Sequence, residues 1–180
     1  TWFKRVGSIT VALTEERKEE IFRSAAMARA FGVDIEEISP TEIGNRYPHL
    51  NISDVKAGVF LDKDGQGEPG NIALALAKGA RQYGALIKER VRVSGIIRRG
   101  RIVTGVNWQS ENGSSGHITC DMIVNCAGMW GHEVGRMAGV SVPLHACEHF
   151  YIVSEPIPGL TQHPVLRVPD ECAYFKEDAG

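Results

Sequence analysis

The sequence lacks three features that would each point to a distinct class of protein. It has no apolar run near the roughly 20 residues that a membrane-spanning helix needs. Its formal net charge is only -2, so no charge excess favours nucleic acid or an anionic membrane surface. Its four cysteines, at positions 120, 126, 147 and 172, include no CxxC pair. A thiolate zinc site is therefore disfavoured, and free thiols in a reducing compartment are expected.

The start of the chain, TWFKRVGSIT, also lacks an initiator methionine, an apolar signal region and a transit-peptide pattern. We therefore expect the sequence to be the middle of a longer protein. It has 180 residues, of which 43% are hydrophobic. This is enough for the buried core of one domain or of two small ones.

The N-terminal part alternates between strand and helix signals. Strands are predicted over residues 8–13, 33–38 and 55–61 from their β-branched and apolar residues. Thr14, followed by glutamates, predicts a helix that continues to about Phe31. The tetrapeptide SPTE at 39–42 predicts the start of a second, shorter helix.

The middle of the chain combines one predicted helix with a predicted antiparallel meander. Residues 71–83 are rich in alanine and are followed by Gly84, which is typical of a helix with a glycine stop. Three strands are predicted, from Val91 toward Ile97, over RIVTGVNWQ and at HITC. The turns between them are predicted at Arg99-Gly100 and Asn112-Gly113.

The stretch CDMIVNCAGMWG, residues 120–131, has the pattern of a strand that ends in small residues. The strand is predicted over Met122–Cys126 and ends at Ala127-Gly128. Such an ending lets the backbone come close to a ligand or to a crossing helix, and the residues alone leave both open. A short helix is predicted over about 131–138, and extended segments over 141–144 and 149–155.

The loop GQGEPG at 65–70 matches the GxGxxG pattern of dinucleotide-binding turns, after a predicted strand and before a predicted helix. However, Pro69 lacks an amide hydrogen, and the neighbouring acidic residues repel phosphate. The alternative is a glycine-rich connector in which Pro69 starts the helix. The residues favour this second interpretation.

The segment HACEH at 145–149 matches the HxxEH pattern of inverted zinc peptidases. On a helix, both imidazoles would project from one face and could hold zinc. In an extended chain, His145, Cys147, His149 and Tyr151 would share a face instead. Pro143 before the motif and HFYIV after it favour the extended form, so no metal ligands are assigned. Zinc hydrolysis stays as an alternative function.

Three segments carry a resemblance to a known family: PGNIALALAKGARQYGALI, CDMIVNCAGMWGHEVGRMAGVSVPLHACEHFYIVSE and PVLRVPDECAYFKEDAG. The chain resembles the FAD-dependent amine oxidoreductases of the D-amino-acid-oxidase superfamily, in particular sarcosine and dimethylglycine dehydrogenases. The implied fold is α/β (mixed α+β), a partial FAD-binding Rossmann-like unit with a β-meander, interleaved with an antiparallel substrate-binding sheet. The resemblance assigns 1–68 and 141–180 to the substrate-binding domain and 69–140 to the FAD-binding domain.

The resemblance implies FAD as the cofactor. In the family, the strand equivalent to Met122–Cys126 closes the flavin-binding sheet, and its small terminal residues lie against the flavin. The strand that follows GALIKE would meet adenine through its backbone. The cofactor-binding residues implied in this sequence are Val93, Cys126, Ala127, Gly128 and Trp130.

The implied reaction is oxidation of the C–N bond of an N-methyl amino acid, such as sarcosine or dimethylglycine, by hydride transfer to FAD. The implied catalytic residues are His149, Tyr151 and Tyr174. The Tyr174 hydroxyl would hold the substrate carboxylate, and His149 would orient the substrate or exchange its amine proton. His149 and Tyr151 would face the substrate side of the flavin if 149–155 form a strand.

The family's pyrophosphate-binding GxGxxG unit and its closing flavin segment are expected outside this sequence, which would then be a fragment of a flavoenzyme. The implied partners are a small N-methyl amino acid, an electron-transfer flavoprotein and, through a separate domain, folate. Neither nucleic acid nor a membrane is expected as a partner. The implied location is the mitochondrial matrix in a eukaryote or the cytoplasm in a bacterium. A non-catalytic homologue, like the regulatory subunit of pyruvate dehydrogenase phosphatase, is the alternative, because it shares the PLHACEHFY type of segment.

Overall fold

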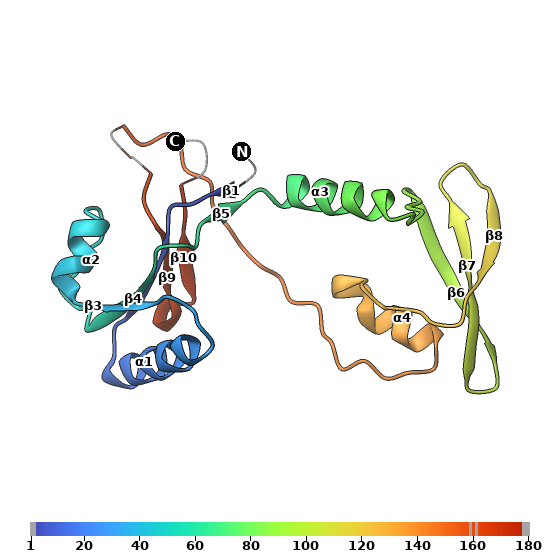
Figure 1. The fold of residues 1–180 in the computed structure, drawn as a ribbon, viewed down its shortest axis with the longest axis horizontal. Coiled ribbons are helices and arrows are strands. Elements are labelled where there is room, and N and C mark those ends of the chain that lie inside the picture. Colours follow the sequence, from blue (N-terminus) through green and yellow to red (C-terminus); the bar gives the residue numbers. More distant parts are fainter. Residues whose placement is uncertain (1–2, 159, 161, 178–180) are drawn as a thin grey trace. The chain divides into compact units, whose positions relative to one another are not determined.

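The computed structural model describes residues 3–158, 160 and 162–177. The chain divides into two compact units (Figure 1). The first unit contains residues 1–79 and 152–180, and the second unit contains residues 80–151. Two ends of the quoted segments lie outside the described residues: 1–2 of TWFKRVGSIT and 178–180 of AYFKEDAG. The first unit is therefore built from two stretches that are distant in the sequence.

A five-stranded sheet forms the centre of the first unit (Figure 1). Its strand order is β10-β9-β2-β4-β3, with the bounds Ala173–Phe175, Val165–Val168, Ser8–Ala12, Ala57–Leu61 and Glu36–Ile38. Neighbouring strands are antiparallel except β2 and β9, which run parallel with Ile9 beside Leu166. The sheet expected to be antiparallel thus contains one parallel pair, because β2 and β9 come from separate stretches of the chain and no hairpin joins them.

One face of this sheet packs against α2, Pro40–Arg46. The core on this face consists of Ile9, Val11, Ile38, Ile43, Val55, Phe60, Leu166 and Val168. The helix begins as predicted, because the Ser39 hydroxyl accepts a hydrogen bond from the Glu42 N–H while the Glu42 carboxylate accepts one from the Ser39 N–H. The hydrogen bonds from Ser39 stabilise the charged carboxylate and so lower the pKa of Glu42.

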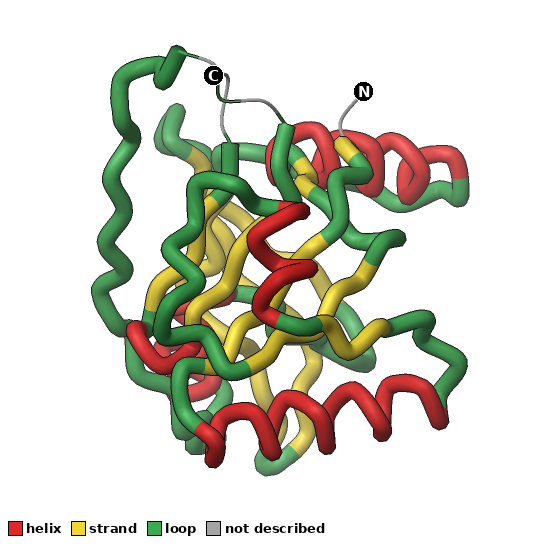
Figure 2. The backbone as a smooth tube through the Cα atoms, turned by 90° about the vertical axis from the view of Figure 1, so that its left-hand side faces the viewer, coloured by secondary structure: helices red, strands yellow, loops and turns green. Residues whose placement is uncertain are grey.

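The opposite face packs against α1, Glu15–Ala30 (Figures 1 and 2). Ile21 and Ala25 of this helix are buried with Ala12 and Val59 of the sheet. The predicted start of the helix is confirmed, since the Thr14 hydroxyl accepts a hydrogen bond of 3.1 Å from the Arg17 N–H. In the central strands β2 and β4, helices on both faces of the sheet bury both sets of alternating residues.

The glycine-rich loop at 65–70 forms a connector within the first unit. Gln66–Gly67 is strand β5, which pairs with β1, Phe3–Lys4, and α3, Pro69–Gln82, begins at the predicted proline. A Cβ atom at position 65 would meet the backbone of Lys4, and one at position 67 would meet the side chain of Ile72. Close contacts within the chain therefore account for both glycines, in agreement with the interpretation as a connector.

The second unit contains a three-stranded meander and a short helical segment. The strands β6, β7 and β8 are Val91–Arg99, Ile102–Ser110 and Ser115–Thr119, in that order, and they confirm the predicted meander. The helical segment consists of the 3-10 helix η1, Gly128–Trp130, and of α4, Gly131–Met137. The Arg98 guanidinium donates a hydrogen bond of 2.6 Å to the carbonyl of Ala138. This contact ties the meander to the C-terminal end of α4, where a positive charge is favourable.

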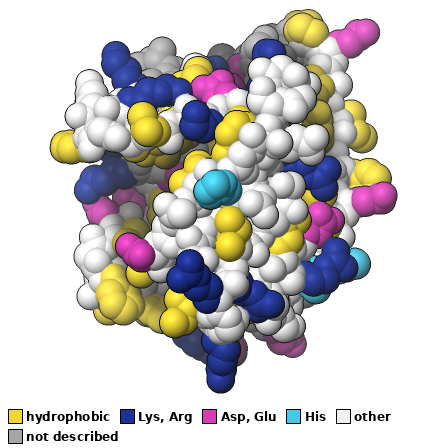
Figure 3. Space-filling model, turned by 90° about the vertical axis from the view of Figure 1, so that its right-hand side faces the viewer, with side chains coloured by type: hydrophobic (Ala, Val, Ile, Leu, Met, Phe, Trp, Pro, Cys, Tyr) yellow, Lys and Arg dark blue, Asp and Glu magenta, His cyan; other side chains and the backbone are white. Residues whose placement is uncertain are grey.

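Surface composition agrees with the small net charge. Figure 3 shows basic, acidic and hydrophobic side chains on the same face of the molecule. In the part of the chain that the structure describes, no helix combines the length and the apolar character needed to cross a bilayer. The cysteines at 120, 126, 147 and 172 are free thiols, as predicted.

The strand predicted at 122–126 is wrong, and the segments predicted to be extended, 141–144 and 149–155, form no strand. Residues 122–126 and 149–155 pair with none of the described strands. In the first segment, Asn125 Oδ1 accepts a hydrogen bond of 3.2 Å from the Ala127 N–H, and Asn125 Nδ2 donates one of 2.9 Å to the Gly131 carbonyl. These local bonds fold the backbone into a turn. In the second segment the residues are exposed, and a strand needs the N–H and C=O groups of a neighbouring strand to form.

Candidate functional site

A row of side chains crosses the sheet of the first unit on the face that packs against α1. Tyr174 in β10 lies directly opposite Arg167 in β9, and Arg167 lies beside Thr10 in β2. The next residue in this row is Val59, which belongs to the core under α1. Directly opposed residues project to the same face of a sheet, so Tyr174 and Arg167 share the α1 face. Both side chains are exposed, Tyr174 to 52%.

The Tyr174–Arg167 pair has the chemistry of a carboxylate site. A guanidinium offers paired N–H donors that match a carboxylate, and a phenol adds an O–H donor. Cβ atoms of directly opposed residues lie about 5 Å apart, which lets both groups reach one carboxylate. The resemblance in the sequence points to Tyr174 but not to Arg167. The register of the β9–β10 hairpin is the signal that connects the two, and it cannot be read without knowing the turn between the strands.

The turn of this hairpin is anchored to the rest of the first unit by Asp170. The turn is the 3-10 helix η2, Pro169–Glu171. The Asp170 carboxylate accepts hydrogen bonds from the Leu13 N–H at 2.9 Å and from the Arg17 Nε at 3.2 Å. The bond from Leu13 and, after it, the guanidinium of Arg17 lower the pKa of Asp170. This anchor should hold while Asp170 is charged and weaken as the pH falls through that lowered pKa.

An aromatic and imidazole cluster lies at the other end of β9. The His163 ring packs against Tyr47 with 4.9 Å between ring centroids, and against His49 with 5.2 Å. His163 is only 9% exposed, and its Nε2 is buried without a hydrogen-bond partner. Burial, reinforced by His49, lowers the pKa of His163, and burial raises the pKa of the Tyr47 phenol. The cluster therefore favours the neutral form of both side chains.

We expect the stability of the protein to decrease as the pH falls below the ordinary imidazole pKa of 6.5, in part because of His163. The unfolded chain takes up a proton there first, since the pKa of His163 is lowered only in the folded chain. Above that pH the His163 imidazole is neutral in both the folded and the unfolded chain, so it adds no pH dependence to the free energy of unfolding. His163→Phe keeps an aromatic ring beside Tyr47 and should flatten this pH dependence, measured as the urea midpoint by circular dichroism. Curves of equal slope for both proteins would contradict the assignment.

In the second unit, the predicted flavin-binding residues Cys126, Ala127, Gly128 and Trp130 follow one another in a turn that leads into α4. Gly128 has a φ of +53°, and no atom lies within 4 Å of the position of a Cβ there. Cys126 and Trp130 are exposed, and Ala127 is half-buried. The turn therefore presents backbone without a covering side chain, which a flat ring can approach.

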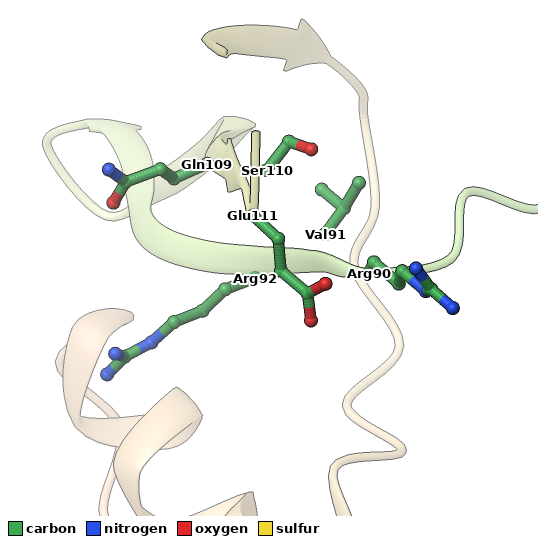
Figure 4. Close-up of a pocket in the computed structure, with 6 residues that line it drawn as sticks. All are labelled: Arg90, Val91, Arg92, Gln109, Ser110 and Glu111. Carbon is green, nitrogen blue, oxygen red and sulfur yellow. The ribbon is translucent and has the colours of Figure 1, made fainter. Parts of the chain in front are cut away.

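Val93, the predicted adenine-side residue, lies in β6 opposite Trp108 of β7. The register shifts between Val93 and Gly95, so this part of the strand contains a bulge. A shallow hollow at the start of β6 is lined by Arg90, Val91, Arg92, Gln109, Ser110 and Glu111. Figure 4 shows these side chains pointing in different directions rather than toward one point. The hollow thus has no converging polar groups.

The remaining predicted residues lie in the connection that follows α4. His149 and Tyr151 belong to the second unit and are exposed, Tyr151 to 83%. Tyr174 belongs to the first unit. Residues 145–149 form no helix, so the helical face that the HxxEH zinc motif requires is absent there. Among the described residues, no group of three or more His, Cys, Asp or Glu side chains is arranged to hold a metal ion.

Comparisons with known proteins identify the family. The family described as "FAD dependent oxidoreductase" (DAO) matches residues 1–180. Mitochondrial sarcosine dehydrogenase of Homo sapiens is 35% identical over 178 residues, which cover 94% of this chain and 18% of that protein. The mitochondrial pyruvate dehydrogenase phosphatase regulatory subunit of Mus musculus is 35% identical over 184 residues, which cover 100% of this chain and 20% of that protein. The chain therefore spans about a fifth of the length of these relatives.

A solved structure supports the fold. L-proline dehydrogenase from P. horikoshii superposes with a TM-score of 0.78 and 24% sequence identity, over 98% of this chain and 47% of that one. The chain belongs to the FAD-dependent oxidoreductases of the DAO family, as its three resembling segments predicted. FAD is the cofactor of this family. The mixed α/β fold, with a meander beside a partial Rossmann-like FAD-binding unit, is confirmed.

Proposed function

We propose that the chain is part of a flavoenzyme that oxidises the C–N bond of N-methyl amino acids such as sarcosine or dimethylglycine. The observation that carries this proposal is the Tyr174–Arg167 pair, which lies exposed on one face of the five-stranded sheet. An amino-acid substrate always carries a carboxylate, and a fork of N–H and O–H donors on a sheet fixes its orientation. The similarity of the chain to sarcosine dehydrogenase supports this proposal, because sarcosine is an amine that also carries a carboxylate.

The second unit would hold the cofactor in this proposal. The backbone at Cys126, Ala127 and Gly128, with Trp130 just beyond, would lie against the flavin, and the backbone of Val93 would meet adenine. The uncovered turn at Gly128 supports this placement. When bound, FAD supplies the acceptor for the hydride that leaves the substrate.

The protein groups would orient the substrate and control its protonation. Tyr174 and Arg167 would hold the carboxylate, so that the methyl C–H bond is presented in one direction. Only an amine with a free electron pair can release hydride and form an iminium. As the resemblance implies, His149 would exchange the amine proton, and Tyr151 follows it in the same connection.

We expect Tyr174→Phe to raise KM for sarcosine about 10-fold while leaving kcat within about 2-fold, because one hydrogen bond to a charged group is lost. The measurement is steady-state turnover of the full-length flavoprotein with an artificial electron acceptor at varied sarcosine. Anaerobic bleaching of the flavin absorption band after adding sarcosine or dimethylglycine first shows whether the amine reduces the flavin. The matched control is Tyr83→Phe, because Tyr83 is an exposed tyrosine directly after α3. This variant should leave both constants unchanged. An unchanged KM in Tyr174→Phe would contradict the role of the phenol.

The regulatory alternative is a second candidate, because the phosphatase regulatory subunit matches the whole chain at the same identity as sarcosine dehydrogenase. The bleaching experiment separates the two. A flavin band that persists with every N-methyl amino acid would favour the regulatory protein, whereas rapid bleaching would favour the enzyme. We also propose the mitochondrial matrix as the location in a eukaryote. An electron-transfer flavoprotein and folate are proposed as partners of the whole enzyme.

A further inference from the structure

The contact between Asp170 and Arg17 joins parts of the first unit that are far apart in the sequence. Asp170 is 153 residues from Arg17 and 157 residues from Leu13, and its side chain is only 16% exposed. One carboxylate thus binds the backbone just after β2 and a side chain in the first turn of α1. Arg17 is itself held, since its backbone N–H donates a hydrogen bond to the Thr14 hydroxyl and its Nη1 donates one to the Glu20 carboxylate.

The anchored turn sets the direction of a short edge strand. β10 has only three residues and lies at the end of the sheet, so β9 is its single neighbour. Three paired residues leave an edge strand free to twist unless its turn is fixed. Cys172, between η2 and β10, adopts the left-handed conformation with a φ of +53°, which gives the chain one sharp change of direction there. Any movement of η2 would therefore also move Tyr174, which lies two residues after Cys172.

We propose that Asp170 and Arg17 are positioning residues, which fix the β9–β10 hairpin so that Tyr174 and Arg167 meet the substrate carboxylate together. This inference rests on the proposed function. Neither residue touches substrate in this proposal. They act by keeping the phenol and the guanidinium at the spacing that a single carboxylate requires.

The test compares two carboxylates that both bind Arg17. Asp170→Asn keeps the size of the side chain but removes the charge that holds the guanidinium. Glu20→Gln removes the other, more exposed partner of Arg17 and leaves the hairpin turn untouched. We expect Asp170→Asn to raise KM for sarcosine about 10-fold with little change in kcat, and Glu20→Gln to change KM less than about 2-fold.

A double-variant cycle distinguishes positioning from general loss of stability. If Asp170 acts through Tyr174, then Asp170→Asn should raise KM by less than about 2-fold when Tyr174→Phe is already present. Equal factors in both backgrounds would overturn the proposal. A wild-type KM in Asp170→Asn would overturn it as well.

Hydrogen exchange followed by mass spectrometry supplies a readout that needs no activity. We expect Asp170→Asn to lose protection in 169–175 while β3 and β4 keep theirs, and Glu20→Gln to keep protection in both. Loss spread evenly through the sheet would overturn the positioning role. If the wild-type flavoprotein is not reduced by any amine, the proposed function fails, and the exchange pattern still decides whether Asp170 anchors the hairpin.

Discussion

Replacing Arg167 by methionine is expected to lower kcat/KM for sarcosine about 100-fold, which corresponds to about 2.8 kcal/mol of lost transition-state binding. Arg167 lies opposite Tyr174 and beside Thr10, in strand β9, which pairs with β10 on one side and with β2 on the other. Pairing on both sides fixes the backbone of Arg167, and a charged, forked contact to a carboxylate is stronger than a neutral one. The loss should exceed that of Tyr174→Phe for this reason.

The design of this experiment separates charge from geometry. Arg167→Lys retains the positive charge but not the paired donors, so it should recover only part of the loss. Arg101→Met, at an exposed position in the β6–β7 turn, removes a similar charge elsewhere and should leave kcat/KM unchanged. For an amine substrate that lacks a carboxylate, kcat/KM should be the same in wild type and in Arg167→Met. Equal losses for both kinds of substrate would show that Arg167 does not read the carboxylate.

Replacing Gly7 by alanine is expected to destabilise the protein by about 3 kcal/mol or more. Gly7 has a φ of +76°, a conformation that costs a residue with a Cβ about 1–2 kcal/mol. A Cβ there would also lie 2.6 Å from Phe60 Cε2 and 3.2 Å from the carbonyl oxygen of Leu61. Phe60 has little freedom to move, because its ring is buried in the α2-side core and Arg46 stacks on it at 4.1 Å.

Gly32 provides the matched control for Gly7. Its φ of +79° is nearly the same, but no atom lies within 4 Å of the position of a Cβ. Gly32→Ala should therefore cost only the backbone term, about 1 kcal/mol. The difference between the two variants in urea-induced unfolding measures the packing contribution at Gly7. Equal losses of stability in both variants would contradict a contribution from Phe60.

Local signals in the sequence predicted a large part of this fold. Thr14 and the Ser39–Glu42 pair place helix starts correctly because a cap needs only a few neighbouring residues. The turn at Asn112-Gly113 is confirmed by the φ of +86° at Gly113, which few residues other than glycine adopt. The meander follows from such turns, since each strand pairs with the next one along the chain.

Non-local contacts were not accessible from the sequence. The parallel pairing of β2 with β9 depends on residues more than 150 positions apart. Arg167 was missed because its relation to Tyr174 arises only from the register of a hairpin. The strand predicted at Met122–Cys126 pairs with none of the described strands, and at its end the amide of Asn125 makes local hydrogen bonds, which apolar periodicity does not register.

The parallel pair β2–β9 also determines the order in which the protein can assemble during its synthesis. Strands β2, β3 and β4 and both of their helices are synthesised before Leu166 and Val168, which follow only after residues 80–151 have been made. Until then one edge of β2 has no partner, and the core around Ile9 is incomplete. A nascent chain with such an open edge can pair with other chains. We therefore expect the earlier half of the first unit to depend on rapid elongation or on a chaperone until β9 closes the sheet.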